Sequence, residues 1–396
     1  MMHALFKALG NGYARLWRMH WLSVLLMLGL SATGVAMIYS ATHTSEQPFL
    51  RIAAEQQIVW MGVGFIGFCI MAMIDYHFWA RHGFWLLGLA VILLIVTLIV
   101  AKPVNGAKSW LIFGPLRVQP AELTKLAYIC ALTHLLYLLR KRIHTVWAFL
   151  AACGLAIIPF GLIMKQPDLG SGLVFGPITL FALFVAGARK RYVLFPVLAI
   201  AIIFAASYLW VHKMGKPVPY LKEYQNNRIR TFFDPSRDPR GAGWTINQSL
   251  IAIGSGGLQG KGYIKGDQNV YGFLPKNIAY NDFIFAIVGE ELGFIGGGAL
   301  ILVEALLMFC MIQIAFRAAD TAGAVIAAGI LGLFFTHFFV NIGMTIQVVP
   351  ITGIPLPFIS YGGTFIVVCM AAMGLLQSIW ASRHTRISQL NPTTAS

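Results

Sequence analysis

The feature that most constrains this chain is a series of apolar stretches, each about as long as a membrane is thick. Hydrophobic residues make up 58% of the sequence and charged residues 11%, against about 25% charged residues in an average soluble domain. A helix of about 20 residues crosses roughly 30 Å of hydrocarbon. The sequence therefore predicts an all-α integral membrane protein, a bundle of about ten transmembrane helices, over residues 21–40, 56–74, 84–101, 122–139, 146–164, 172–187, 192–212, 292–316, 322–345 and 361–380.

The basic residues predict how this bundle is oriented. With a cytoplasmic N-terminus, the inner segments carry Lys7, Arg15, Arg18, Arg81, Arg140, Lys141, Arg142, Arg189, Lys190, Arg191, Arg317, Arg383 and Arg386. This is the positive-inside pattern. An even number of spans returns the short tail, residues 381–396, to the cytoplasm. Many spans follow the first apolar stretch, so we expect it to be an uncleaved helix rather than a secretory signal.

Net charge and cysteine usage exclude other classes of protein. The formal net charge of +15 is dispersed among apolar stretches rather than gathered into one basic module, so we expect membrane lipids and no nucleic acid as partners. The five cysteines each lie in an apolar run without ligand-like spacing, which is typical of small core residues. We expect one polytopic membrane domain over residues 1–396.

A long polar connection, residues 213–283, separates the seventh and eighth predicted spans on the non-cytoplasmic side. Structureless loops of this length are rare in compact proteins and are usually functional or disordered. This one carries aromatic and aliphatic side chains that can pack, among them Tyr220, Tyr224, Phe232, Phe233, Trp244, Ile251, Tyr263 and Phe273. We expect short helical pieces folded over the outer mouth of the bundle.

Within this loop, the glycine-rich stretch 254–262 invites comparison with a phosphate-binding loop, whose backbone N–H groups converge on an anion. The pattern does not match, because Ser255 stands where a glycine is needed and Gly262 follows Lys261 where a Ser or Thr is needed. A tight turn at the membrane surface is favoured over direct phosphate contact.

Asp282 is a lone acid just before an apolar run that ends in Glu290 and Glu291. Acids at membrane depth are costly and usually face a cavity or a partner. Two interpretations stay open on physical grounds: Asp282 caps a helix or forms an ion pair, or it has a catalytic or binding role.

A second polar group opens the fourth predicted span. Pro120 suits a first helical turn, and Glu122 and Lys125 share one helix face at i, i+3 spacing. An exposed pair of this kind stabilises a helix by only roughly 0.2–0.5 kcal/mol. At a membrane edge the pair can also hold a cation where an anionic ligand approaches, so a structural and a functional interpretation are equally favoured.

Other outside-facing charges surround the same mouth: Arg51, Lys102, Lys108, Arg117, Lys165 and Asp168. Each can be a solvated interfacial charge, but together the cations favour an anionic substrate from the outer leaflet. His337 and Asn341, four residues apart, are expected to form a hydrogen-bonding face for helix packing rather than a metal site. No metal-binding signature is present.

Five motifs, in this order along nearly the whole chain, resemble the SEDS family (shape, elongation, division and sporulation). They lie at residues 119–125, 166–171, 248–257, 282–293 and 355–363. Residues 348–358 resemble the elongation branch of the family rather than its division branch. Asp282 matches the family's essential acid, although Asn281 stands where the family has Thr. Lys276 and Asn277 are further departures, at positions where Glu and, a little later, His are usual.

The resemblance implies a ten-span peptidoglycan glycosyltransferase of the bacterial inner membrane, which polymerises lipid II at the outer face. Asp282 would then be the catalytic base. Lys125, Arg51, Lys165 and Arg117 would bind the pyrophosphate, Glu122 would orient Lys125, and Asp168 would order its loop. The implied partners are a class B penicillin-binding protein, which is a transpeptidase, and other elongation-complex membrane proteins. The sequence requires no cofactor, and assistance by a divalent cation, Mg²⁺ or Mn²⁺, stays open.

Two other functional classes are compatible with a many-helix bundle that holds charges. One is a flippase or transporter of lipid-linked precursors, against which the large packed outer loop counts. The other is a non-catalytic scaffold for cell-wall proteins, which would tolerate substitution of Asp282.

Overall fold

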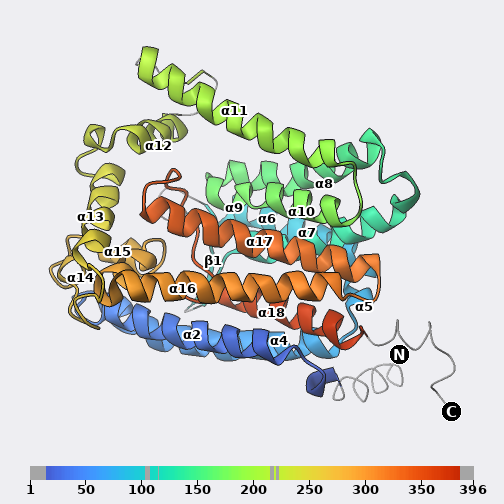
Figure 1. The fold of residues 1–396 in the computed structure, drawn as a ribbon, viewed down its shortest axis with the longest axis horizontal. Helices are drawn as coiled ribbons and strands as arrows, with labels where there is room; N and C mark the ends of the chain where they lie inside the picture. Colours follow the sequence, from blue (N-terminus) through green and yellow to red (C-terminus); the bar gives the residue numbers. More distant parts are fainter. Residues whose placement is uncertain (1–14, 103–107, 115, 215–217, 220–222, 384–396) are drawn as a thin grey trace.

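The protein is a bundle of long helices capped at one end by shorter ones (Figure 1). We analysed a computed structural model, which describes residues 15–102, 108–114, 116–214, 218–219 and 223–383. Lys7 and Arg386 of the predicted inner set, Tyr220 of the outer loop and most of the C-terminal tail lie outside the described residues.

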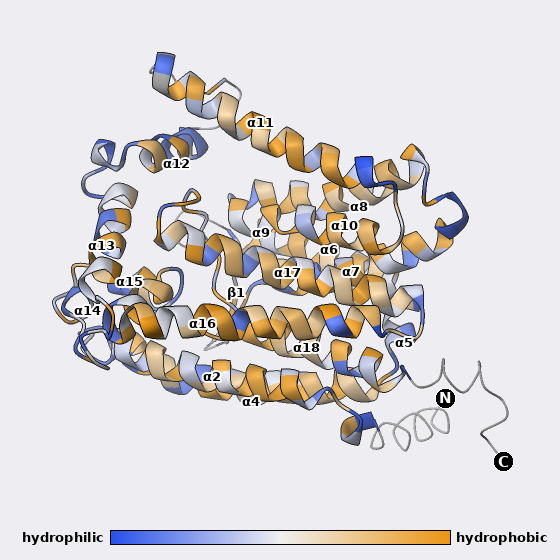
Figure 2. Ribbon diagram, viewed as in Figure 1, coloured by the Kyte–Doolittle hydropathy of each residue, from blue (hydrophilic) through white to orange (hydrophobic). Residues whose placement is uncertain are grey.

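Eight helices in the described part are long and apolar enough to cross a membrane. They are α2 (Trp21–Thr42), α4 (Ala53–Met73), α6 (Gly83–Val100), α8 (Val146–Lys165), α11 (Lys190–Met214), α16 (Ile284–Phe316), α17 (Thr321–Thr345) and α18 (Gly363–Ala381). Apolar residues cover these helices on most sides (Figure 2), as expected for helices that face lipid or a bundle core. The predicted all-α multi-pass membrane fold is confirmed.

The two other predicted spans are also helical, and they pack against members of this group of eight. Helix α7 (Pro120–Leu138) is less apolar because it buries polar side chains, including Glu122, Thr124 and Lys125. The predicted span 172–187 is shifted by two to three residues toward the N-terminus and is divided into two helices: α9 (Leu169–Leu173) and α10 (Phe175–Val185) together form the apolar stretch Leu169–Val185.

Helix α16 begins at Ile284, before the predicted span, and the predicted start at residue 292 falls at a break between two helical segments. It contains a kink at Gly293, whose φ of 67° is accessible to glycine. Glu290 and Glu291 remain in the helix because Lys261 Nζ lies 2.7 Å from Glu290 Oε1, and Ser40 Oγ donates to Glu291 Oε1 at 2.5 Å. Partners for the two acids therefore allow the helix to start nearer Asp282.

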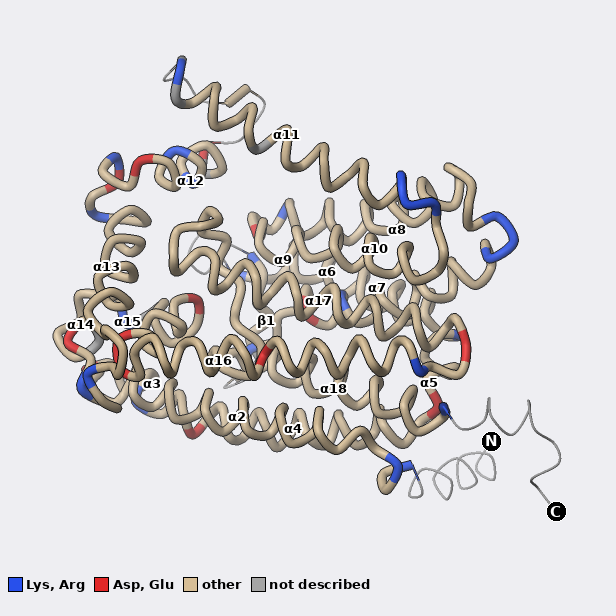
Figure 3. The backbone as a smooth tube through the Cα atoms, viewed as in Figure 1, with Lys and Arg blue, Asp and Glu red and all other residues tan. Residues whose placement is uncertain are grey.

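The two ends of the bundle carry different kinds of residues. At one end lie short α5 (Tyr76–Arg81), the 3-10 helix η1 (Arg140–Arg142) and the start of α11, where Lys and Arg gather (Figure 3). The His20 N–H donates to Gln377 Oε1 at 2.7 Å, so the start of α2 adjoins the end of α18. Both ends of the described chain therefore lie on one side, in agreement with an even number of spans.

The opposite end holds the polar connection, which folds as predicted into short helices. They are α12 (Glu223–Phe233), the 3-10 helix η2 (Pro235–Arg237), α13 (Ala242–Ser255), α14 (Asp267–Val270) and α15 (Lys276–Ala279). Ser249 Oγ of α13 donates to the Thr345 carbonyl at 2.8 Å, which attaches the connection to α17. Two more elements share this end: α3 (Pro48–Arg51) and a hairpin of β1 (Leu111–Phe113) and β2 (Leu116–Val118).

The glycine-rich stretch forms a turn against α16. The Lys261 and Gly262 N–H groups donate to the Glu290 and Glu291 carbonyls, both at 3.0 Å, and Phe294 N–H donates to the Gly257 carbonyl at 2.8 Å. These N–H groups satisfy carbonyls at the kink of α16 and do not converge on an anion, so the interpretation as a turn is confirmed.

Candidate functional site

Asp282 lies in the turn between α15 and α16, held by its backbone. Its N–H donates to the Ile278 carbonyl at 2.9 Å, and its carbonyl accepts from Asn341 Nδ2 at 3.0 Å. The N-cap residue of α16 is Phe283, and no side-chain hydrogen bond caps this helix. The Asp282 carboxyl group is therefore not a helix cap. Oδ1 is buried and has no hydrogen-bond partner among the described residues, and no ion pair involves Asp282 there. The structure thus disfavours both the capping and the ion-pair interpretation.

Three residues near Asp282 in the sequence or in the fold also have a buried polar atom without a hydrogen-bond partner in the described residues. These atoms are Asn281 Oδ1, Asn341 Oδ1 and Thr352 Oγ1. Their proximity follows from two contacts: Asn341 Nδ2 also donates to the Ile354 carbonyl at 2.8 Å, and a Cβ placed on Gly353 would lie 3.2 Å from Asp282 Oδ2. Buried polar groups in proteins are rarely left without partners. Four such atoms at one place indicate a site that binds a polar ligand.

The environment of Asp282 tunes its acidity. Burial, and then the negative charge of Asp168, raises the pKa of Asp282 to about 7, while the positive charge of Arg228 opposes the rise. A carboxyl group with a pKa near neutrality can both accept and release a proton under physiological conditions.

Asp168 joins two of the sequence motifs. Its Oδ1 accepts from the Ser171 N–H at 3.0 Å, which caps α9, and its Oδ2 accepts from Gln119 Nε2 at 2.9 Å. Gln119 in turn precedes α7. Asp168 therefore orders its own loop and connects it to the start of α7, in the vicinity of Asp282.

The Glu122–Lys125 pair lies deeper than the sequence suggested. Lys125 Nζ is 2.7 Å from Glu122 Oε1, with side-chain exposures of 0% and 3%, so the predicted pairing is present but no membrane-edge cation results. The second partner of Lys125 is His337 Nε2 at 3.1 Å. Because an ammonium group only donates, His337 carries its proton on Nδ1, which donates to the Pro355 carbonyl at 2.9 Å. The pair is linked through His337 to the loop beside Asp282.

The three other cations predicted to bind substrate are all exposed. Arg51 Nε donates to the Ser45 carbonyl at 2.6 Å, and Lys165 ends α8. Arg117 lies on β2, and its charge acts on Tyr280 and Tyr361 beside the site. Within the described residues none of the three forms an ion pair with a carboxylate.

Comparison with known proteins decides the family. The model of the FtsW/RodA/SpoVE family, described as cell cycle proteins, matches residues 19–385. The chain belongs to this family. The resemblance to SEDS proteins is thereby confirmed.

Individual relatives match the chain over nearly its full length. The peptidoglycan glycosyltransferase RodA of Treponema pallidum is 35% identical, with 91% of this chain and 96% of the relative covered. The peptidoglycan glycosyltransferase MrdB of Escherichia coli K12 is 34% identical, with 91% and 93% covered. A solved structure of a peptidoglycan synthase complex that coordinates polymerization and crosslinking is also similar, with a TM-score of 0.76 and 28% sequence identity. The match covers 92% of this chain and 98% of the chain in that structure.

Sequence reasoning missed Arg228, which this FtsW/RodA/SpoVE protein contributes from α12 of the outer connection. One guanidinium nitrogen donates to the Thr352 carbonyl at 3.4 Å, beside Gly353 and the Asp282 carboxyl. Arg228 is one of several basic residues in the connection, and no spacing or motif in the sequence distinguishes it from the others. The aromatic residues of the connection indicated that it packs, and a cation on a packed cap can face inward.

Lys276, at a position where the chain departs from the family pattern, is a tether. Its Nζ donates to the Thr44 carbonyl at 3.0 Å and contacts Thr44 Oγ1 at 2.9 Å. Lys276 therefore attaches α15 to the segment after α2. It makes no hydrogen bond to the Asp282 carboxyl group.

The described residues contain no group of three or more His, Cys, Asp or Glu side chains suited to hold a metal ion. Asp168, the acid whose charge acts on Asp282, already uses both carboxylate oxygens on Ser171 and Gln119. Assistance by Mg²⁺ or Mn²⁺ stays a prediction.

Proposed function

We propose that this protein is a peptidoglycan glycosyltransferase that polymerises lipid II at the outer face of the bacterial inner membrane, with Asp282 as its catalytic base. Two relatives that bear the name of this activity match almost the entire chain. The observation that carries the proposed role of Asp282 is its Oδ1 atom, which is buried and has no hydrogen-bond partner among the described residues, next to the Thr352–Gly353 segment that Arg228 contacts.

In the reaction, the acceptor's 4-hydroxyl oxygen forms a new bond to the donor's anomeric carbon, while the bond from that carbon to undecaprenyl pyrophosphate breaks. Asp282 takes the hydroxyl proton. A positioned base is typically worth about 10²–10⁴ in rate, and it works best when its pKa lies near the operating pH. The raised pKa of Asp282, about 7, meets this condition.

The leaving pyrophosphate gains negative charge and needs cations. Arg228 is the proposed principal contact, because its guanidinium group borders the Asp282 loop. Arg117, Arg51 and Lys165 add positive charge at the same mouth. Electrostatic stabilisation of this kind often contributes more to catalysis than any other single effect.

Glu122 and Lys125 are proposed to act by positioning rather than by touching the pyrophosphate. Lys125 is fully buried and bonds His337, which holds the Pro355 carbonyl. The segment 351–355 carries Thr352 and Gly353 toward Asp282. Asp168 supports the opposite side of the site through Gln119 and Ser171.

The proposed topology follows from chemistry and charge. The protein is a multi-pass membrane protein, and we place its termini and the basic end of Figure 3 in the cytoplasm by the positive-inside rule. The connection over residues 213–283 is then periplasmic. The complex that matches this chain combines polymerization with crosslinking, which supports a class B penicillin-binding protein as partner, together with other elongation-complex membrane proteins.

The test is polymerisation of lipid II supplied only on the outer side of reconstituted vesicles. The wild-type chain, with and without its transpeptidase, should form glycan polymer on a gel, and Asp282→Asn should fold but form none. Asp234→Asn is the matched control, since Asp234 is an outer-loop acid paired with Arg237. A flippase or a non-catalytic scaffold would form no polymer under these conditions, even as the wild-type chain.

A further inference from the structure

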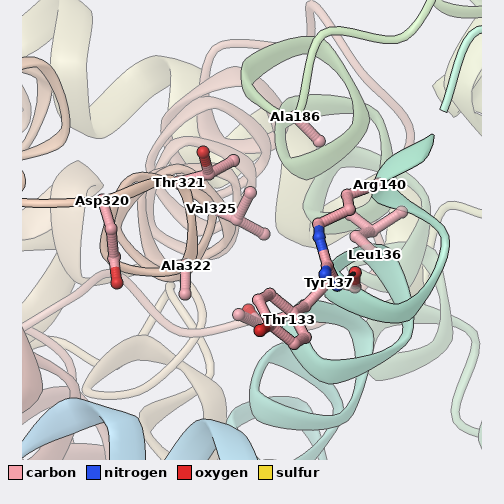
Figure 4. Close-up of a pocket in the computed structure, with 9 residues that line it drawn as sticks. All are labelled: Thr133, Leu136, Tyr137, Arg140, Ala186, Asp320, Thr321, Ala322 and Val325. Atoms are coloured by element: carbon pink, nitrogen blue, oxygen red, sulfur yellow. Dashed lines mark hydrogen bonds between the residues drawn. The ribbon is translucent and has the colours of Figure 1, made fainter.

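A cavity of about 160 Å³ lies at the basic end of the bundle, opposite the Asp282 site (Figure 4). Its walls come from the last turns of α7 and η1, the residue after α10 and the first turns of α17: Thr133, Leu136, Tyr137, Arg140, Ala186, Asp320, Thr321, Ala322 and Val325. The volume is several times the roughly 30 Å³ that one water molecule occupies in the liquid. It can therefore hold a small polar group.

Arg140 dominates the chemistry of this cavity. Its guanidinium group stacks over the Tyr137 ring at 4.4 Å and donates to the Tyr137 carbonyl at 3.1 Å. No carboxylate in the described residues forms an ion pair with it. A guanidinium group has five N–H donors, so donors remain for an anion. Figure 4 shows the group held on the α7 side of the cavity, facing α17.

The one acid in the wall, Asp320, is already neutralised by other groups. Its carboxylate accepts from Tyr76 Oη at 3.0 Å, from the Gly323 N–H at 2.8 Å, and lies 2.6 Å from His77 Nε2. Figure 4 shows Asp320 on the far side of the α17 turn from Arg140. Because the Asp320 carboxylate also caps the N-terminal end of α17, the positive charge available inside the cavity is that of Arg140.

The remaining walls are apolar or carry hydroxyl groups. Leu136, Ala186 and Val325 line the cavity, and close to them in the chain the large apolar side chains of Leu138 and Phe184 are exposed. An anionic group held by Arg140 would therefore have an apolar surface next to it. Basic pockets between transmembrane helices on the cytoplasmic side are typical sites for anionic lipid headgroups.

We propose that this cavity binds the phosphate headgroup of an anionic phospholipid, with Arg140 as the phosphate ligand and the hydroxyl group of Thr321 beside it. The acyl chains would lie along the exposed apolar side chains at the ends of α7 and α10, which include Leu138 and Phe184. The site is separate from the chemistry at Asp282, so lipid binding and polymerisation can be tested independently.

Native mass spectrometry of the purified full chain, titrated with phosphatidylglycerol and separately with phosphatidylcholine, tests this proposal. The wild type should retain phosphatidylglycerol preferentially. Arg140→Gln should weaken that retention about tenfold, as expected for loss of hydrogen bonds to a charged group. Lys141→Gln is the matched control, because Lys141 belongs to the same basic turn but is absent from the cavity wall.

A second variant protects the test from a folding artefact. Ala322→Leu fills the cavity and leaves Arg140 in place, so it should also weaken retention, while both variants should elute as single species on size exclusion. Equal losses for Arg140→Gln and Lys141→Gln, or full retention by Ala322→Leu, would overturn the proposal. Displacement of the lipid by inorganic phosphate alone would also overturn it, in favour of a free-anion site.

Discussion

Asp282, at one end of the bundle, differs from Asp75 and Asp320, at the other end, in the bonding of its carboxyl group. At the basic end, Asp75 accepts from Arg15 and from the His77 N–H, and His77 bridges Asp75 to Asp320. At the other end, the Asp282 carboxyl has no comparable partner in the described chain. The hydrogen-bonded carboxylates of Asp75 and Asp320 connect α4 and α5 to the start of α17, whereas the Asp282 carboxyl group connects no elements. Hydrogen bonding of the carboxyl group therefore distinguishes acids that stabilise the fold from an acid that is free to bind a substrate.

The pKa values follow the same division. Burial alone would raise the pKa of Asp75, but hydrogen bonds from His77 and Arg15 lower it below its ordinary value. Hydrogen bonds to the carboxylates of Asp320 and Asp75 raise the pKa of His77 to about 9. For Asp282, burial prevails and the pKa rises. An acid at the basic end is thus held as an anion, and Asp282 is not.

The largest expected effect is on activity at Asp282. Asp282→Asn should lower the polymerisation rate by about 10²–10⁴, the usual contribution of a positioned base. Its melting temperature should stay close to that of the wild type, since no hydrogen bond to the carboxyl is lost. Initial rates on lipid II and thermal melts measure the two effects.

Glu304→Gln is a stringent control for this substitution. Glu304 is 1% exposed in α16, and its Oε1 also has no partner in the described residues. It lies inside the membrane span rather than beside Arg228, so the variant should polymerise normally. Equal loss of activity in both variants would mean that any buried acid matters, and the comparison between the two ends would fail.

The second effect concerns the ion pair inside the bundle. Lys125→Met leaves Glu122 buried without its cation, and breaking a buried pair typically costs about 3–5 kcal/mol. Stability and activity should therefore fall together. The double variant Glu122→Gln/Lys125→Met removes both charges and should recover much of the stability in thermal melts. An activity loss without a change in stability would instead favour direct contact of Lys125 with the substrate.

The third effect concerns Arg228 of α12 and its influence on Asp282. Arg228→Gln removes a cation that opposes the pKa rise of Asp282, so that pKa should increase further. The acidic limb of the pH–rate profile should shift to higher pH, and kcat/KM should fall about tenfold, as for a lost charged hydrogen bond. Arg237→Gln, in the same connection but paired with Asp234, should change neither quantity. An unshifted acidic limb would separate Arg228 from Asp282.

The sequence predicted the helices of this protein better than it predicted how deeply their polar side chains are buried. Length and apolarity identified the spans, and spacing identified the Glu122–Lys125 pair. Its burial was not predictable, because only the folded bundle brings His337 of α17 against Lys125. Arg228 was missed for the same reason, since its place beside Thr352 depends on how α12 folds over the bundle. The start of α16 was misjudged because the partners of Glu290 and Glu291 come from distant segments.

The smallest effect tests the basic end by pH. The pKa of His77 is raised from 6.5 to about 9 in the folded state, so the protonated imidazole contributes stability that is fully present below about pH 6.5. That contribution should disappear as the pH rises through about 9. The melting temperature in detergent should therefore decline over this window, and His77→Gln should reduce the decline without changing polymerisation at neutral pH. An identical decline in the variant would show that the bridge from Asp75 to Asp320 does not depend on the charge of His77, and the contrast with Asp282 would then rest on hydrogen bonding alone.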